Sequence, residues 1–130
     1  MTSYVWRALF DSHEVESLHA EGFGREPATY DWWMQVNHHS LGWVCAREAQ
    51  VLVGFVNVAW DGSTHAFLLD TVVRSSHQRQ GAGRKLVAVA TEKARAAGCE
   101  WLHVDFDEHL SAFYFVSCGF RSTPAGVIPL

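Results

Sequence analysis

The chain contains few cysteines, and their arrangement excludes two kinds of cross-linked structure. There are three, an odd number at wide spacing: Cys45, Cys99 and Cys118. A disulfide scaffold or a structural zinc site needs cysteines in pairs, and no CxxC pair is present. The eight histidines form no HExxH or HxxxH pattern either. We therefore expect buried free thiols, a reducing compartment and no metal site.

Long apolar runs are absent as well. No run approaches the roughly 20 residues that span a bilayer, and residues 1–10 lack the basic start and apolar stretch of a signal peptide. Repeats, low-complexity tracts and linkers are also missing. With 130 residues, 48% hydrophobic and 18% charged, the chain can bury one core. We expect one domain over residues 1–130, located in the cytoplasm and without a membrane partner.

An excess of positive charge is missing too, since the formal net charge is -4. Proteins that bind nucleic acid broadly are basic, because they neutralise backbone phosphates. We therefore expect no nucleic-acid partner. The basic residues gather instead around one glycine turn, where Arg74, Arg79, Arg84 and Lys85 lie close together in the chain.

The apolar pattern predicts strands alternating with helices. Asp61-Gly62 between two apolar runs indicates a hairpin, because glycine tolerates the positive φ of a tight turn. Asp11 or Ser12 can cap the first helix. Strands are predicted at residues 4–10, 41–47, 51–60, 66–73 and 101–106, and helices at residues 12–20, 29–37, 83–97 and 108–117. A terminal strand or strands should follow residue 118, and an edge strand near residues 127–130 could pair with a second copy in a homodimer.

The apolar spacing changes to a helical period after the glycine turn. Strand, turn, helix and strand between residues 66 and 106 form a βαβ unit, whose strands run parallel through a right-handed crossover. The runs before it read as an antiparallel meander. We therefore predict an α/β fold: a single mixed, mostly antiparallel sheet with a central parallel βαβ unit and helices on both faces.

The turn Gln78-Arg79-Gln80-Gly81-Ala82-Gly83 opens that helix. A helix start carries unpaired N–H groups and a positive dipole end, and glycine lets the backbone approach an anion closely. The basic neighbours favour a phosphate-bearing ligand over a turn that serves packing only. The turn lacks the third glycine of a dinucleotide fingerprint and the Lys-Ser/Thr ending of a P-loop, so ATP or a dinucleotide is the weaker hypothesis.

Two motifs resemble those of the GNAT superfamily of N-acetyltransferases. Gln78-x-x-Gly81-x-Gly83, after the strand Leu68 to Val73, resembles its coenzyme A motif. Phe113-Tyr114 followed by Cys118-Gly119-Phe120 resembles its later Tyr…Gly-Phe signature. The predicted order of elements matches the family's along nearly the whole chain. The resemblance implies a GNAT-like acyl-CoA N-acyltransferase fold, with acetyl-CoA as cosubstrate and no metal.

The resemblance also implies where the coenzyme binds. In the family, the strands that flank the glycine turn splay apart, and the pantetheine arm enters between them. The pyrophosphate then takes N–H groups of the glycine turn. Carried over to this chain, the coenzyme-binding residues are Thr71, Val72, Val73, Gln78, Arg79, Gln80, Gly81, Ala82, Gly83 and Arg84.

The implied reaction is direct attack of a neutral amine on the thioester. An amine with a pKa of about 10.4 must first lose a proton, and Asp70 and Asp105 are candidate bases because they lie on the two splayed strands. A backbone N–H near Val73 could stabilise the oxyanion. Tyr114 is the candidate proton donor to the leaving thiolate. Acidic residues at the cleft mouth favour a cationic acceptor, the amine of a small molecule or a peptide.

Aromatic and histidine side chains supply the candidate substrate contacts. Trp32 and Trp33 point about 100° apart on the second helix, so one can face the core and the other, assigned to Trp33, the substrate. His103 alternates with Asp105 on the strand at residues 101–106 and is the second candidate. The remaining tryptophans are assigned to the core: Trp6, Trp43, Trp60 and Trp101.

The sequence departs from the family pattern at two places. Counting back from Phe120, the usual tyrosine position falls on Phe115, one residue after Tyr114. Either the short helix carries one extra residue, or the tyrosine role is lost and Tyr114 is a core aromatic. Asp107 and Glu108 stand where the family often has an asparagine. The alternative function is therefore a non-catalytic acyl-CoA-binding module with a regulatory or interaction role.

Overall fold

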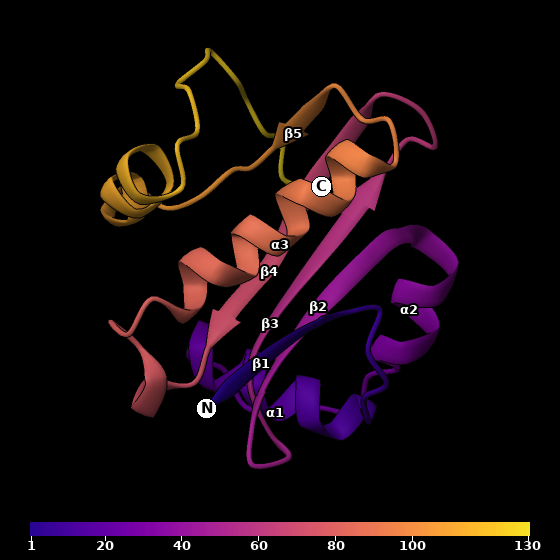
Figure 1. The fold of residues 1–130 in the computed structure, drawn as a ribbon, viewed down its shortest axis with the longest axis vertical. Coiled ribbons are helices and arrows are strands. Elements are labelled where there is room, and N and C mark those ends of the chain that lie inside the picture. The colour runs from indigo at the N-terminus through magenta and orange to yellow at the C-terminus, as the bar shows by residue number, and fades with distance from the viewer.

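Five strands form one sheet in the order β1-β2-β3-β4-β5 in the computed structural model, which describes residues 1–130 (Figure 1). The first four strands pair antiparallel, and β5 pairs parallel to β4. The strands are β1 (Thr2–Trp6), β2 (Ser40–Glu48), β3 (Val51–Trp60), β4 (His65–Val73) and β5 (Trp101–His103). The predicted fold class is confirmed, including the parallel βαβ unit.

Helices cover both faces of the sheet. Helices α1 (Ser12–Phe23) and α2 (Trp32–His39) pack on one face around Phe55, and α3 (Ala82–Ala96) packs on the other, in front of β4 in Figure 1. Helix α3 presents an apolar stripe at spacings of three and four residues, which is why it lies flat on the strands. Its buried members are Ala82, Leu86, Val87, Ala90 and Ala94. None of the helices has the length and apolar character needed to span a membrane.

Helix α1 begins at a capping box. The Asp11 carboxylate accepts from the His13 N–H at 2.8 Å, and the Glu14 carboxylate accepts from the Asp11 N–H at 3.0 Å. The predicted Asp11 cap is therefore confirmed, although the helix runs on to Phe23. The strand predicted at residues 4–10 is too long: β1 ends at Trp6, because Arg7 takes a left-handed φ of 55° and turns the chain away.

A bulge in β4 sets the directions of two consecutive side chains, Asp70 and Thr71. Asn57 pairs with Leu69 and Phe55 with Val72, so Asp70 and Thr71 stand opposite one residue of β3. Asp70 takes a left-handed φ of 60° at this point. Ordinary alternation would turn Asp70 toward α3, as it does Leu68. The bulge turns it toward α1 instead.

The end of the chain differs most from the sequence prediction. Strand β5 ends at His103 rather than at residue 106, and residues 108–117 form a short 3₁₀ turn (Glu108–Leu110) and a π-helical turn (Ala112–Ser117). No strand follows residue 117, and residues 121–130 are exposed and irregular, so the predicted edge strand is wrong. Pro124 and Pro129 lack the N–H that a ladder needs, and Gly126 weakens a strand.

Candidate active site

The glycine turn ends in a helix start with free donors. Gly81 is the N-cap of α3, with a left-handed φ of 85° that suits glycine, and no side chain caps the helix. None of the main-chain N–H groups of residues 79–84 donates a hydrogen bond within the chain. A β-carbon on Gly83 would lie 3.1 Å from the Phe113 ring, so that glycine serves packing. Six adjacent free donors at a positive helix end fit a pyrophosphate.

Side chains from other elements hold this turn in place. Gln78 donates through its amide nitrogen to the Val73 carbonyl at 3.1 Å. His77 bonds the Glu48 carboxylate on β2 at 2.6 Å, and the pKa of that carboxyl is lowered by this hydrogen bond. The Ser75 N–H donates to Glu21 of α1 at 2.9 Å. The turn is therefore tied to three elements of the fold.

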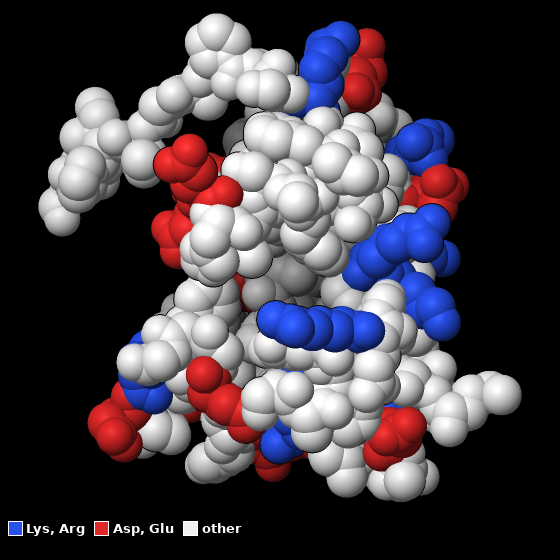
Figure 2. All heavy atoms as spheres, turned by 90° about the vertical axis from the view of Figure 1, so that its left-hand side faces the viewer, with Lys and Arg blue, Asp and Glu red and all other residues white.

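Strand β4 has an open edge beside this turn. Its pairing with β5 stops at Phe67 and His103, and beyond them the chain leaves β4 toward the π-helical turn (Figure 1). The face seen in Figure 2 is hollowed at its centre, and basic side chains border the hollow. Thr71, Val72 and Val73 lie on the open edge, and a 3₁₀ turn at Ser75–His77 connects them to the glycine turn. The ten predicted coenzyme-binding residues thus lie on two neighbouring segments of one βαβ unit, although their roles stay a prediction.

The π-helical turn decides where the tyrosine lies. A π-helix holds one more residue per turn than an α-helix, and the Cys118 N–H indeed donates to the Phe113 carbonyl, five residues back, at 2.9 Å. Tyr114 is buried at 6% exposure and stacks on Phe106 with ring centroids 4.6 Å apart, whereas Phe115 is 38% exposed. The structure therefore corresponds to the first of the two alternatives, in which the short helix carries one extra residue.

The phenol of Tyr114 lies against β4. Burial raises its pKa above the ordinary value, the adjacent Thr71 side chain opposes part of that rise, and the negative charge of Asp105 adds to it. Thr71 follows Asp70 directly in the bulge, but Tyr114 belongs to the core on the α3 face. Tyr114 and Asp70 therefore approach the bulge from opposite faces of the sheet.

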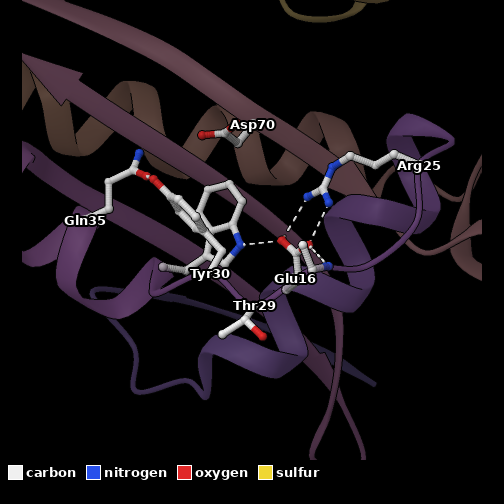
Figure 3. Close-up of a pocket in the computed structure, with 8 residues that line it drawn as sticks. Glu16, Arg25, Thr29, Tyr30, Gln35 and Asp70 are labelled. Atoms are coloured by element: carbon white, nitrogen blue, oxygen red, sulfur yellow. Dashed lines mark hydrogen bonds and ion pairs between the residues drawn. The ribbon is translucent and has the colours of Figure 1, made fainter.

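Asp70 is held by a network that the sequence did not reveal. His19 lies 3.0 Å from one carboxylate oxygen through Nε2, and Asn57 donates to the other at 3.3 Å. The second ring nitrogen of His19 is 2.9 Å from Arg25, which forms a bidentate pair with the buried Glu16 at 2.6 and 2.9 Å (Figure 3). One signal was available: Glu16 lies next to Val15 on the buried side of α1, and an acid in such a place needs partners.

A pocket of about 310 Å³ opens beside this network between the α1–α2 connection and β4. Figure 3 shows Asp70 on one side of it and the Glu16–Arg25 pair on another. Its walls are Glu16, Arg25, Ala28, Thr29, Tyr30, Trp32, Gln35 and Asp70. Of the adjacent tryptophans, Trp32 lines the pocket, whereas Trp33 packs against Phe10 at 5.1 Å between ring centroids. Trp33 therefore does not line this pocket, and its role in substrate binding stays a prediction.

The other predicted substrate and base residues lie elsewhere. His103 and Asp105 line a separate hollow of about 950 Å³ between β5 and the C-terminal segment. His103 stacks on His65 and Phe67, with ring centroids 5.0 and 4.9 Å apart. Trp101 is 53% exposed rather than in the core, because α3 covers only the opposite face of β5. The structure does not bring His103 and Asp105 together with Asp70.

Solved structures of other proteins share this architecture. A probable acetyltransferase from meticillin-resistant Staphylococcus aureus superposes with a TM-score of 0.83 at 20% identity, over 100% of this chain and 98% of that one. A GNAT family protein from Streptococcus pneumoniae gives 0.80 at 22%, over 100% and 98%. Glucosamine-6-phosphate N-acetyltransferase from Arabidopsis thaliana gives 0.79 at 14%, over 98% of each chain. Among curated proteins, none is significantly similar to this sequence.

These structural similarities, all under 25% sequence identity, show the fold alone. The sequence itself matches the model of the acetyltransferase (GNAT) family over residues 6–120, which is nearly the whole chain. That match includes the open edge of β4, the glycine turn and the tyrosine segment. The chain therefore belongs to the GNAT family of acetyltransferases.

Proposed function

We propose that the protein transfers an acetyl group from acetyl-CoA to a primary amine of a small molecule or peptide, by direct attack within a ternary complex. One observation carries the proposal. Asp70 and Thr71 are consecutive in the β4 bulge, yet Asp70 lines the pocket beside α1, whereas Thr71 lies next to Tyr114, which packs in the core on the α3 face. A base and an acid thus flank the same point of the open edge.

Acetyl-CoA supplies the activated acetyl thioester. The free N–H groups of residues 79–84 bind its pyrophosphate, and basic side chains such as Arg79 and Arg84 add attraction. The open edge of β4 at residues 71–73 offers main-chain groups to the extended pantetheine arm. The fold thereby directs the thioester toward the bulge, next to Asp70.

The residues of the bulge region then move the protons. Asp70 accepts one proton from the acceptor's ammonium, and the free amine nitrogen bonds the carbonyl carbon. A main-chain N–H near Val73 donates to the carbonyl oxygen. As the carbon–sulfur bond breaks, Tyr114 gives its proton to the sulfur and is reprotonated through solvent by the second nitrogen proton. Ammonium and thioester thus become amide, thiol and one released proton.

The burial of Tyr114 suits this role. Its raised pKa keeps the phenol protonated at neutral pH, so it is ready to donate. The non-catalytic alternative depends on the displaced tyrosine and on the missing asparagine, and the π-helical turn accounts for the first of these departures. The three cysteines are free, which fits the cytoplasmic location that we expect.

Calorimetric titration with acetyl-CoA tests the coenzyme first, with ATP and NAD as controls. Selective micromolar binding of acetyl-CoA, followed by thiol release with an amine panel, supports the proposal. Binding without thiol release for any amine supports the non-catalytic module instead. No binding to a folded sample contradicts both functions.

A further inference from the structure

The pocket beside β4 contains two carboxylates, and their hydrogen bonds distinguish them. Glu16 accepts four: two from Arg25, one from the Ala28 N–H at 2.7 Å and one from the Trp32 indole at 3.0 Å. Four bonds are the full capacity of an ionised carboxylate. The Arg25 bonds also hold the pKa of Glu16 far below its ordinary range. Glu16 is therefore ionised, saturated and unable to bind a further group.

Arg25 is saturated in the same way at its terminal nitrogens. These carry four hydrogens and meet four acceptors: both Glu16 oxygens, the Glu26 carbonyl at 3.3 Å and His19 Nδ1 at 2.9 Å. The charges of Arg25 and Glu16 also cancel. A ligand carboxylate that entered the pocket would thus find no free donor on the two terminal nitrogens of the guanidinium.

The Arg25 contact fixes the tautomer of His19. A guanidinium can only donate, so Nδ1 of His19 must be the acceptor and carries no proton. The ring proton therefore lies on Nε2 and is donated to Asp70 at 3.0 Å. The ring is held between Phe23 and Trp32, with centroids 4.3 and 4.8 Å away. His19 is thereby a neutral donor aimed at Asp70.

Asp70 keeps free capacity that Glu16 lacks. It accepts only from His19 and Asn57, so half of its acceptor sites stay open toward the pocket, and its side chain is 23% exposed. With Glu16 and Arg25 balanced and His19 neutral, Asp70 is the one uncompensated charge of the pocket. A single cationic group matches it, and an anionic group is repelled.

We propose that this pocket selects acceptors that carry one primary ammonium without a neighbouring carboxylate, and that His19, held in one tautomer by Arg25, is the positioning residue that aims Asp70 at that ammonium. A small alkylamine and the side chain of a lysine in a peptide share this chemistry, whereas a free α-amino acid does not. This specificity rests on the proposed function, but the tautomer and the binding of the ammonium do not.

Nitrogen-15 NMR of the wild-type protein at pH 7 tests the tautomer without any turnover. We expect His19 to show a proton on Nε2 and none on Nδ1. His13 is the internal control, because it contacts Asp11 at 3.0 Å but is 94% exposed and has no arginine neighbour. A proton on Nδ1, or a doubly protonated His19 ring, overturns the assignment.

Acceptor kinetics test the selectivity with butylamine, a lysine peptide blocked at both ends, and 2-aminohexanoate. We expect 2-aminohexanoate to have a kcat/KM at least about tenfold lower than butylamine, because its carboxylate meets Asp70. The blocked peptide distinguishes a peptide acceptor from a free amine. Equal kcat/KM for 2-aminohexanoate and butylamine overturns the proposal.

Variants of His19 test its positioning role. His19→Phe keeps the ring stack but removes the donor, so the KM for butylamine should rise about tenfold while that for acetyl-CoA is unchanged. His19→Gln retains a donor and an acceptor and should stay within about threefold of wild type. His13→Phe is the matched surface control. A His19→Phe protein that behaves like wild type, or a His19→Gln protein as impaired as His19→Phe, overturns the role.

A binding measurement separates this proposal from the proposed function. Butylamine is titrated into the protein with coenzyme A present while the His19 Nε2–H signal is followed. A saturable shift, together with no thiol release when the same amine is mixed with acetyl-CoA in a separate assay, supports the ammonium site and counts against acetyl transfer. Absence of a shift overturns the ammonium site, whether or not thiol is released.

Discussion

At the residue scale, Tyr114 and Phe115 are adjacent aromatics with opposite surroundings. The π-helical turn buries Tyr114 against Thr71 and leaves Phe115 facing outward. Counting back from Phe120 along the sequence cannot show which of the two is buried, because in an ordinary helix the buried position would fall on Phe115. Which of the two aromatics is buried therefore depends on one extra residue in one turn, and this is why we propose Tyr114 as the acid.

Substituting Tyr114 by Phe should lower kcat about a hundredfold and leave the affinity for acetyl-CoA unchanged. The reason is that the ring still fills its place in the core, while the proton donor is gone. Steady-state kinetics with thiol detection give kcat, and calorimetry gives the affinity. In the double variant Tyr114→Phe, Phe115→Tyr we expect no recovery; full recovery would mean that position 115 supplies the proton.

The Glu16–Arg25 pair should control stability in acid. Because the pKa of Glu16 is lowered in the folded state, its contribution is present above the unfolded value of about 4.3 and is lost as pH falls below it. Glu16→Gln should reduce the free energy of unfolding at pH 7 by about 3 kcal/mol. The free energy of unfolding of the Glu16→Gln variant should also decline less than that of wild type between about pH 4 and about pH 2.

Urea unfolding across this pH range measures the effect. Glu92→Gln is the matched control, since Glu92 pairs with Arg95 on the exposed surface of α3 at 71% exposure. Such a pair contributes well under about 1 kcal/mol. Equal losses in the two variants would contradict the buried role of Glu16.

At the element scale, the start of α3 joins a strained turn to a row of free donors. Gly81 has a φ of 85° and open space around it, so the backbone angle and not crowding demands glycine there. Gly62 in the β3–β4 hairpin is its match, with a φ of 80° and equally open surroundings. The two glycines therefore have similar backbone angles and surroundings, but only Gly81 lies beside the free N–H groups at the start of α3.

Gly81→Ala should reduce the free energy of unfolding by about 1 kcal/mol and weaken acetyl-CoA binding about tenfold, because the donors shift with the backbone. Gly62→Ala should produce a similar loss of stability and no change in coenzyme affinity. Thermal unfolding and calorimetry give both quantities. An unchanged affinity in Gly81→Ala would place the pyrophosphate elsewhere.

At the scale of the whole molecule, stability is concentrated at the centre of the sheet. Strands β2 and β3 are buried along most of their length and flanked by helices on both faces, whereas residues 121–130 are exposed and form no hydrogen bond between backbone groups. The central strands are therefore held by many contacts, whereas the C-terminal ten residues are held by few.

Amide hydrogen exchange should follow this division. We expect residues 121–130 to exchange within seconds and the central residues of β2 and β3 to exchange only through global unfolding. Mass spectrometry of peptides after timed exchange resolves the two regions. Strong protection of residues 121–130 would indicate a strand that forms there in solution.

Local patterns in the sequence were sufficient for most of the architecture. The Asp11 cap, the Asp61-Gly62 hairpin and the helical period after Gly83 each depend on neighbours within a few residues, so they can be read from a linear chain. The same holds for the glycine turn, whose free N–H groups are a property of any uncapped helix start. The order of these signals was enough to indicate the family.

Only the tertiary structure decided the arrangement of the pocket that we propose for the acceptor. His19 and Asp70 are 51 residues apart and meet only because a bulge reverses the direction of one side chain in β4. Trp32 rather than Trp33 faces the pocket, because the rotation of α2 is set by packing on the sheet. Contacts of this kind depend on how distant elements pack, and no spacing along the chain encodes them.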